Sequence, residues 1–466
     1  MKGPFDLAGI LARSSAGGCL GLRDHLHPSL ARLLEMLGFD HAFVRGEGAH
    51  LWLKDGTRIL DCLAGFGAHL LGRGHPVVRE ALHQCLASDP PGWVRMSPNG
   101  LASEAARLLK ERSGRPEDLV YFANSGTEGV EAAIKLARRH TTKAGIAGWV
   151  DGFHGFTMGA LSVSGIDSLK QGFGDLLPHC HSVPFGDLEA MERLLEGGSI
   201  AAVIIEPIQG KTLRCLSTSD MQSLHAMCRR SGALLIADEV QTGLGRTGSF
   251  LALARDQVEA DIVVLSKGLS GGFVPMGAVL VRPQIWRSTF SGMERSFVHS
   301  STHHEGPLAM VAAIATLEAL TSELLVERSM EIGEGILVSL RESLAGCAAV
   351  REVRGRGMMI GVEIDPARVP SLRDIPWVGD WTAPMVGQSL VMDLFQRERV
   401  LGQVTESRRP VLKLLPPLCI AKEDATALCE AVPRSIQRLS EGSTLKAVAV
   451  AASRLVKSGI LGMAGG

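Results

Sequence analysis

Residues 233–268 read ALLIADEVQTGLGRTGSFLALARDQVEADIVVLSKG, and this stretch decides the fold class. It contains two short apolar runs, ALLIADEV (233–240) and DIVVLS (261–266). Continuous apolar runs of this length are typical of strands that are buried on both faces of a mostly parallel sheet. Asp238 lies near the end of the first run, and Lys267 directly follows the second. The stretch therefore predicts two buried strands, each with a charged group at its carboxyl end.

Similar runs on either side of this stretch alternate with helical patterns, as is typical of α/β domains. We therefore predict a large α/β domain over residues 71–325. Its further strands are predicted at LVYFAN (119–124), IAAVIIEP (200–207) and GAVLV (277–281), and its helices at VREALHQCLA (78–87), ASEAARLLKERS (102–113) and GVEAAIKLARRH (129–140).

The flanking segments predict a smaller α+β domain built from both ends of the chain. HPSLARLLEMLGF (27–39) has helical spacing of apolar residues, and Asp55-Gly56 marks a hairpin turn. A long helical pattern begins near residue 325 and leads into VREVRGRGMMIGVEI (350–364). We assign residues 1–70 and 326–440 to the small domain, and residues 441–466 to a C-terminal helix and tail.

The composition argues against several classes of function. A formal net charge of −1 on 466 residues provides no basic field that would attract nucleic acid or an anionic membrane. Asp6 and Arg13 interrupt the N-terminal apolar stretch, so a signal peptide is not predicted. Lys446, Arg454 and Lys457 interrupt the C-terminal one before it could span a bilayer. Nine scattered cysteines without a C-x-x-C pair predict a reducing cytoplasm.

Ser125-Gly126-Thr127 follows the predicted strand 119–124 and begins a predicted helix. Small residues at a helix N-terminus leave backbone N–H groups free, and such groups bind phosphate well. The alternative is structural, with a serine or threonine N-cap and Glu128 completing a capping box. The segment alone does not decide between the two.

Asp238 and Lys267 are the candidate chemical groups. A carboxylate at a buried strand end needs a positive or protonated partner, and a protonated pyridine nitrogen would serve. A partly buried lysine has a lowered pKa and is a nucleophilic amine that can form a Schiff base. The alternative is a lysine that extends to solvent. Asp238, Lys267 and the helix start at Ser125 each lie at the end of a predicted strand. Their positions at successive strand ends favour one common site.

These residues belong to motifs that resemble a known family. From about residue 40 to about residue 430, the chain is similar to the class III aminotransferases of pyridoxal-phosphate fold type I, which include ornithine, acetylornithine and putrescine aminotransferases. The resemblance implies a large, mostly parallel seven-stranded sheet and the cofactor pyridoxal 5'-phosphate. It also implies transfer of an amino group from an amine to an oxo-acid, aldehyde or ketone acceptor such as pyruvate or 2-oxoglutarate. The shared motifs are LDCLAGFGAHLLGRGHPVV, FANSGTEGVEAAIKLAR, FHGFTMGALS, IIEPIQG, LLIADEVQTGLGRTG, VVLSKGLSGGFVPMGAV, VRGRGMMIGVE and LPPLCI.

The resemblance implies a role for each site residue. Lys267 would form the Schiff base and shuttle the proton, and Asp238 would keep the pyridine nitrogen protonated. Phe153 would stack on the ring, and Gln241 would hydrogen-bond near the phenolic oxygen. Thr302 would reach the phosphate from the neighbouring subunit of a homodimer with shared active sites. The other residues that the resemblance places at the cofactor are Ser125, Gly126, Thr127, His154 and Glu206.

The chain departs from the family at positions that bear on the substrate. Phe156 stands where many relatives have an arginine that binds a substrate carboxylate. Lys211 and Lys413 stand where relatives often pair a glutamate with an arginine, and two lysines repel each other unless an anion lies between them. We predict a more apolar pocket, also lined by Phe66, and a terminal or aliphatic amine, polyamine or amino acid as donor. The two lysines are candidates for binding an anionic substrate group, and core packing is the alternative role of both phenylalanines.

Two further patterns are set aside. Residues 243–248 have the form G-x-G-x-x-G, but no helix pattern opens within them, so a dinucleotide site is not predicted. His299, His303, His304 and Glu305 are metal-ligand types, but their segment is loop-like and rich in serine, and no metal is predicted.

Other functions of the same fold stay open. Aminomutases and decarboxylases use the same cofactor and lysine, and a non-catalytic relative could act as a binding subunit. Carbon dioxide release, or turnover of one substrate without an acceptor, would indicate the first two functions.

Overall fold

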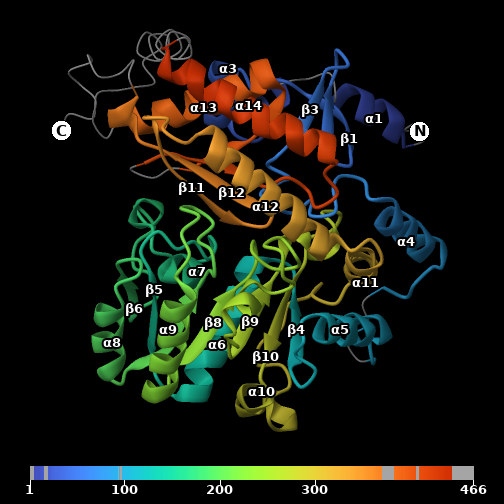
Figure 1. Cartoon of the computed structure of the whole chain (residues 1–466). Helices are drawn as coiled ribbons and strands as arrows, with labels where there is room; N and C mark the ends of the chain where they lie inside the picture. The colour runs from blue at the N-terminus through green and yellow to red at the C-terminus, as the bar shows by residue number, and fades with distance from the viewer. Residues whose placement is uncertain are drawn as a thin grey trace.

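The structure is a computed structural model that describes residues 5–14, 19–92, 94, 97–369, 382–405 and 409–442. Figure 1 shows two parts, with one large sheet and its helices below and two smaller sheets with long helices above. Most of the predicted C-terminal helix and tail, 441–466, lies outside the described residues. The predicted domain boundaries stay a prediction.

The largest sheet confirms the predicted α/β fold with seven mostly parallel strands. Its order is β4-β10-β9-β8-β7-β5-β6, and only β10 runs antiparallel to its neighbours. All five strands predicted individually are present. The strands are β4 (Leu119–Ala123), β5 (Gly145–Trp149), β6 (Cys180–Val183), β7 (Ile200–Ile205), β8 (Leu234–Asp238), β9 (Ile262–Leu265) and β10 (Gly277–Val281).

Two strands of this sheet, β5 and β6, have weak sequence signals. β5 reads GIAGW, and its two glycines reduce its strand propensity. β6 reads CHSV and is a mostly exposed edge strand with polar residues at its centre. Their place in the sheet therefore depends on the tertiary pairing and not on local hydrophobicity.

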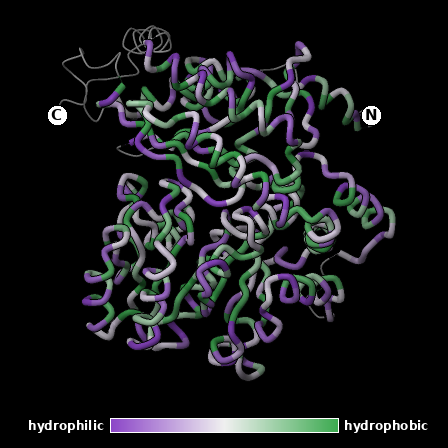
Figure 2. The backbone as a smooth tube through the Cα atoms, in the orientation of Figure 1, coloured by the Kyte–Doolittle hydropathy of each residue, from purple (hydrophilic) through white to green (hydrophobic). Residues whose placement is uncertain are grey.

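The large sheet separates two hydrophobic clusters. Along β8, Leu235 and Ala237 belong to one cluster and Ile236 to the other, because successive side chains of a strand point to opposite faces. In Figure 2, hydrophobic segments run through the middle of the molecule and hydrophilic ones are frequent along its outline. Burial on both faces explains why the strand sequences are continuously apolar.

Helices cover both faces of this sheet (Figure 1). α6 packs against the central strands, α9 packs on β8, and α11 packs against α4 and α5. The helices predicted at 78–87, 102–113 and 129–140 are confirmed as α4, α5 and α6. The helices of this part are α4 (Pro76–Ala87), α5 (Gly100–Arg112), α6 (Gly126–Thr141), α7 (Met158–Val163), α8 (Leu188–Glu196), α9 (Thr218–Ser231), α10 (Pro283–Phe290) and α11 (Pro307–Ser322), with short 3₁₀ turns η1 (Asp167–Leu169), η2 (Ala252–Asp256), η3 (Lys267–Ser270) and η4 (Met293–Arg295).

The two ends of the chain meet in the upper part of the molecule. One sheet has the order β1-β2-β3-β13, in which C-terminal β13 pairs in parallel with N-terminal β3, and β2 and β3 form the predicted hairpin. The other sheet has the order β11-β12-β15-β14. Their strands are β1 (Phe43–Glu47), β2 (His50–Leu53), β3 (Arg58–Asp61), β11 (Val350–Arg356), β12 (Met359–Ile364), β13 (Val400–Leu401), β14 (Gln403–Val404) and β15 (Val411–Leu414).

The helices of the upper part include the predicted helix within 27–39, which is confirmed as α3. They are α1 (Leu7–Ser14), α2 (Leu20–His25), α3 (Pro28–Leu37), α12 (Leu325–Ser343), α13 (Thr382–Glu398) and α14 (Lys422–Ser440), with the 3₁₀ turn η5 (Pro366–Arg368). Within the described ranges, no single helix is long and apolar enough to cross a membrane, and α11 and α12 meet that test only as a pair bent by 62°.

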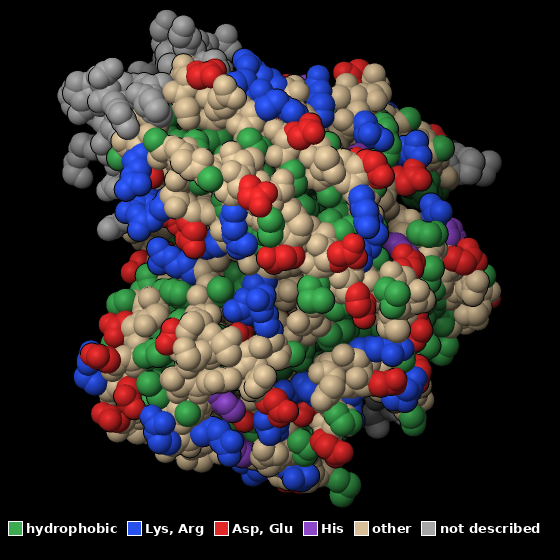
Figure 3. Space-filling model, viewed as in Figure 1, with side chains coloured by type: hydrophobic (Ala, Val, Ile, Leu, Met, Phe, Trp, Pro, Cys, Tyr) green, Lys and Arg blue, Asp and Glu red, His purple; other side chains and the backbone are tan. Residues whose placement is uncertain are grey.

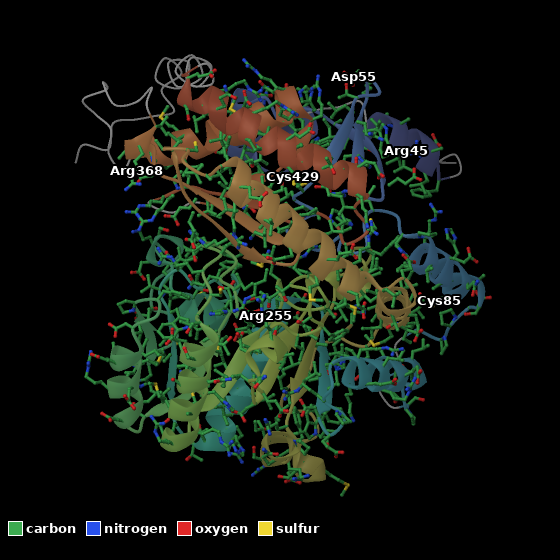
Figure 4. The ribbon with its side chains drawn as sticks, in the orientation of Figure 1. Arg45, Asp55, Cys85, Arg255, Arg368 and Cys429 are labelled. Atoms are coloured by element: carbon green, nitrogen blue, oxygen red, sulfur yellow. The ribbon has the colours of Figure 1, made fainter. Side chains whose placement is uncertain are left out.

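The distribution of charged side chains and the state of the cysteines agree with what the composition indicates. Figure 3 shows acidic and basic side chains mixed over the visible face. All nine cysteines lie in the described part of the chain and are free thiols. In Figure 4, Cys85 on α4 and Cys429 on α14 lie on well-separated elements.

Candidate active site

The structure places Asp238 and Lys267 at one edge of the large sheet. β8 and β9 are parallel neighbours, so their carboxyl ends lie side by side. Asp238 ends β8 and is only 4% exposed, and half-buried Lys267 begins η3 just after β9. Burial lowers the pKa of Lys267, while the negative charges of Asp238 and Glu206 oppose that shift. The charge of Asp238 therefore influences the protonation of Lys267 within one buried region.

Lys267 adopts an unusual backbone conformation. Its φ angle is 42°, in the left-handed region that a residue with a Cβ rarely adopts, at a cost of about 1–3 kcal/mol. The next residue, Gly268, packs so closely that a Cβ there would lie 2.8 Å from Leu70 Cβ. The Lys267 side chain is half-buried at this tight turn.

Asp238 has a buried protein partner that the sequence did not reveal. His154 Nδ1 donates a hydrogen bond of 2.7 Å to Asp238 Oδ2, and the His154 backbone N–H donates to Ser164 Oγ at 2.9 Å. Burial alone would lower the pKa of His154, but the hydrogen bond and charge of Asp238, together with Glu206, outweigh it and raise that pKa. An imidazolium at this position places a positive charge in contact with the Asp238 carboxylate.

Glu206 organises the two loops that flank this pair. Its Oε2 accepts a hydrogen bond of 2.9 Å from the Phe153 N–H, and its Oε1 accepts one of 2.7 Å from the Gly210 N–H. Burial raises the pKa of Glu206, partly offset by the charge of His154. Glu206 therefore positions backbone, and the loop that it holds carries the Phe153 ring.

The start of α6 has the cap that one interpretation of the sequence predicted and keeps the free N–H groups that the other requires. Ser125 Oγ caps the helix by accepting from the Glu128 N–H at 3.3 Å, and Glu128 Oε2 accepts from the Asn124 N–H at 2.7 Å. The N–H groups of Gly126 and Thr127 have no acceptor within the described part of the chain. Two free N–H groups at a helix N-terminus are the kind of group that binds phosphate, and here they lie next to the cap.

The space at this helix start is narrow. A Cβ on Gly126 would lie 2.9 Å from Val240 Cγ2 and 3.3 Å from Ser266 Cβ, so the position accepts only glycine without rearrangement. Thr127 Oγ1 lies 2.7 Å from Thr157 Oγ1 and accepts from the Thr157 N–H at 3.3 Å. Thr157 was not among the predicted residues, and its only sequence signal is its position next to Phe156.

Three aromatic side chains lie on the open side of the site. Phe153 is half-buried, and its ring centroid is 5.0 Å from that of Phe156 in an edge-to-face arrangement of 65°. Phe156 is 70% exposed and Phe66 is 52% exposed. Core packing, the alternative role for Phe66 and Phe156, is therefore wrong for these side chains in this chain.

Lys413 lies on β15, and its amine has no hydrogen bond with Lys211 in the described part of the chain. Its Nζ donates to the Gly210 carbonyl at 2.5 Å and to Gln241 Oε1 at 2.7 Å, and the side chain is almost fully buried. Burial and the positive charge of Lys267 lower the pKa of Lys413 to about 7. Lys211 is half-buried, and its amine makes no hydrogen bond or ion pair with any residue in the described ranges. The two lysines that the sequence treated as a pair thus have different surroundings.

Thr302 lies in a loop that is hydrogen-bonded to Asn124, the residue before Ser125. Thr302 is exposed, while its neighbour Ser301 accepts from Asn124 Nδ2 at 2.8 Å. Burial and the charge of Lys135 lower the pKa of His299 to about 4. Within the described residues, no group of three or more potential ligands is arranged to hold a metal ion. A shared role for Thr302 depends on a second subunit.

The glycine-rich loop 243–248 contains a structural arginine that the sequence reading missed. The loop consists of turns, and fully buried Arg246 donates through Nη1 to the carbonyls of Met358 and Pro416. The Met358 N–H and Ser329 Oγ donate back to the Arg246 carbonyl at 2.9 and 3.1 Å. The motif therefore joins the large domain to the upper part.

Two more arginines, both from VRGRG, complete this junction. Arg354 donates to the Thr212 carbonyl at 2.6 and 3.0 Å, and Arg356 pairs with Asp256 at 3.0 Å. In Figure 4, Arg255, the neighbour of Asp256, lies at the middle height where the two parts meet. Side chains from the sheet β11-β12-β15-β14, called the upper sheet below, thus hold the loop after β7 at Gly210 and at Thr212, on both sides of Lys211.

Known proteins share this sequence and arrangement. The Aminotransferase class-III family model matches residues 37–436. The acetylornithine aminotransferase of Methanopyrus kandleri is 39% identical over 330 residues, covering 70% of this chain and 81% of that protein. Aminotransferase PigE of a Serratia species is 32% identical over 448 residues, which are 89% of this chain but 52% of PigE, so the chain spans about half the length of that protein.

Solved structures agree with this likeness. The ornithine aminotransferase of Toxoplasma gondii superposes with a TM-score of 0.77 at 30% identity and covers 86% of this chain and 91% of its own. An amine transaminase from an uncultivated Pseudomonas species, in its PLP-bound form, has a TM-score of 0.77 at 26% identity and covers 86% of this chain and 95% of its own.

Proposed function

The chain belongs to the class-III aminotransferase family, and we propose that it takes an apolar amine that carries no carboxylate as donor. It is a PLP-dependent aminotransferase, with an amino donor and an oxo-acid acceptor as its substrates. The observation that carries the proposal is the edge-to-face pair of half-buried Phe153 and exposed Phe156, on the loop whose His154 contacts Asp238. The relatives named above are aminotransferases, so an aminomutase, a decarboxylase or a binding subunit finds no support among them.

The residues present fit the cofactor. A buried carboxylate, Asp238, has one long contact at Oδ1 among the described residues, 3.2 Å from the Val240 N–H, and could accept from a protonated ring nitrogen. The free N–H groups of Gly126 and Thr127 would hold the phosphate, and Phe153 would cover the ring face. When bound, PLP supplies an aldehyde and an electron-withdrawing ring.

Each remaining group has a role toward that reaction. Lys267 Nζ, with its lowered pKa, would hold the cofactor aldehyde and then move a proton at the donor carbon. Asp238, hydrogen-bonded by His154, would keep the ring nitrogen charged. Glu206 would hold the Phe153 backbone, and so the ring that covers the cofactor, in place.

The donor specificity follows from the side chains at the mouth of the site. Phe66 and Phe156 present apolar surface, and burial of such surface favours an alkyl chain by about 25 cal/mol per Å². Phenylalanine at position 156 cannot make the charge-assisted contact that an arginine makes with a carboxylate. Terminal and aliphatic amines, including polyamine-type donors, should therefore have higher kcat/KM values than ornithine or acetylornithine.

The substitution Phe156→Arg tests this specificity. A guanidinium at this exposed position should raise kcat/KM for ornithine by about 10-fold and lower it for an alkyl amine by a similar factor. The matched control is Phe173→Arg, which changes another exposed phenylalanine outside the site and should leave both values unchanged. Steady-state kinetics with both donors measure the change. An unaltered preference in Phe156→Arg would contradict apolar recognition of the donor.

We further propose a homodimer whose subunits share active sites. The segment before Thr302 exposes Met293 (92%), Phe297 (60%) and Val298 (47%), and such surface is typical of a protein interface. Exposed Thr302 would then reach the phosphate site of the partner. All nine cysteines are free thiols, which supports the proposed location in the reducing cytoplasm.

Mixed dimers test the shared site. Lys267→Ala and Thr302→Glu should each be nearly inactive as homodimers, the second because a carboxylate would repel the phosphate. Unfolding both together and refolding them should restore about a quarter of the wild-type activity, because half of random dimers are hybrids with one intact site. Activity that stays at the level of the separate variants would show that each chain builds its site alone.

A further inference from the structure

Lys413 makes its contacts inside the protein. It lies in the middle of the upper sheet, where β15 pairs with β12 at Gly361 and with β14 at Gln403. From there its amine reaches the Gly210 carbonyl at 2.5 Å and Gln241 Oε1 at 2.7 Å. The side chain is 4% exposed, so little of it is accessible to a substrate in this conformation.

The contact with Lys413 decides which way the Gln241 amide points. A lysine amine has N–H groups to donate, so it must meet the oxygen of the amide. The Gln241 nitrogen is then turned to the other side, where Nε2 donates to the Phe66 carbonyl at 2.8 Å. In the reverse orientation, NH₂ would face Lys413 and the oxygen would face a carbonyl, so both contacts would be lost.

One N–H of Gln241 remains after these contacts with the described residues. An amide nitrogen carries two N–H groups, and one is used by the Phe66 carbonyl. Because Lys413 holds the oxygen, the edge that stays available carries a donor and not an acceptor. The phenolic oxygen of PLP requires a donor, and the sequence resemblance places Gln241 beside that oxygen.

The local backbone is built for this arrangement. A Cβ on Gly210 would lie 2.9 Å from both Gln241 Oε1 and Glu206 Oε1, so only glycine permits the close approach of the three groups. Gly210 is also fixed at its N–H by Glu206 and at its carbonyl by Lys413. Lys413, Gln241 and Glu206 therefore form one continuous hydrogen-bonded frame around the loop after β7.

We propose that Lys413 is a positioning residue that orients the Gln241 amide so that its N–H edge faces the phenolic oxygen of the cofactor. The inference rests on the proposed function, because it requires PLP in this site. It also gives Lys413 a role other than binding a substrate carboxylate. Loss of the proton would not by itself remove either contact, since a neutral amine still has two N–H groups for its two acceptors.

A double-mutant cycle on cofactor affinity tests the inference. Lys413→Met and Gln241→Ala should each raise the dissociation constant of PLP about 10-fold, the loss expected for one hydrogen bond. The double variant should be no weaker than Gln241→Ala alone, because Lys413 acts through Gln241. The measurement is a titration of the apoenzyme with PLP, followed by the visible absorption of the bound cofactor. Lys422→Met, at an exposed lysine of α14, is the matched control and should bind PLP like the wild type.

Two further measurements keep the outcome clear. Gln241→Glu leaves an acceptor for Lys413 but removes the N–H edge, so it should also lose PLP affinity, and it decides the matter if Lys413→Met does not fold. Effects that add in the double variant, or an unchanged PLP affinity in Lys413→Met or in Gln241→Glu, would overturn the inference.

Substrate kinetics distinguish the positioning role of Lys413 from binding of a substrate carboxylate by Lys413. They also test the proposed function separately. If Lys413 instead binds a substrate carboxylate, Lys413→Met would raise KM only for carboxylate-bearing substrates and leave PLP binding unchanged, which would also overturn the inference. A wild-type protein that binds no PLP, or prefers ornithine as donor, would contradict the proposed function. A wild type that binds PLP and prefers alkyl amines, with additive variants, would contradict only the role of Lys413.

Discussion

Lys267→Ala should lower kcat/KM for every amine donor by roughly 10,000-fold or more. The substitution removes the amine that would hold the cofactor and move the proton, and no neighbouring group can replace it. Lys413, the other lysine amine close enough to influence its charge, is already bonded to Gly210 and Gln241. Single-turnover measurements with an alkyl amine, followed by the visible absorption of the cofactor, report the loss directly.

The same variant should remain folded. Burial lowers the pKa of Lys267, so the native state holds this amine less favourably than the unfolded state does at neutral pH. Its removal should therefore leave the free energy of unfolding of the apoenzyme unchanged or raise it. Lys422→Ala, at an exposed position, is the control that should keep full activity. Substantial residual turnover by folded Lys267→Ala would exclude this lysine as the catalytic amine.

Asp238→Asn should lower kcat by roughly 1,000-fold, the second largest effect that we expect. The amide is nearly isosteric, but it carries no charge to keep the ring nitrogen protonated. It also removes the charge that raises the pKa of His154, so the buried imidazole should become neutral. Measurement of kcat, together with the pH dependence of the visible absorption of the bound cofactor, tests both consequences.

Glu239→Gln provides a matched comparison at the next position in the chain. Glu239 is buried as well, but its carboxylate accepts from Thr242 Oγ1 at 2.6 Å and from the N–H groups of Ala252 and Leu253 at 3.0 and 3.1 Å. It therefore holds the loop after β8, and its loss should reduce stability with little effect on kcat. Equal effects of the two substitutions on kcat would contradict a special role for Asp238.

The position of Lys211 shows how the loop after β7 could influence specificity. Lys413 and Arg354 fix the carbonyls of Gly210 and Thr212, the residues on either side of Lys211. The backbone of Lys211 is thus held from the upper sheet, while its amine keeps no partner in the described parts of the chain. Of the two lysines proposed to bind an anionic substrate group, Lys211 is the one whose amine remains available.

Much of the fold was predictable because its signal is local. The strands around Asp238 and Lys267 are continuous apolar runs, and the helices start at recognisable caps such as Ser125. β5 and β6 lacked such a signal, because glycines and polar edge residues make them strands only through pairing. The motifs also placed Asp238 and Lys267 at one edge, since parallel neighbours end on the same side.

The sequence by itself thus determined which residue types stand at the carboxyl ends of the buried strands. Buried strands are continuous apolar runs that alternate with helices, and this pattern is visible in the sequence. Only the tertiary structure decided their partners. His154 meets Asp238 across 84 positions of sequence, and Lys413 meets Gly210 across 203, separations that carry no periodic signal. Hydrogen bonds between distant loops depend on the packing of whole domains, and that packing is what separates the role of Lys413 from that of Lys211.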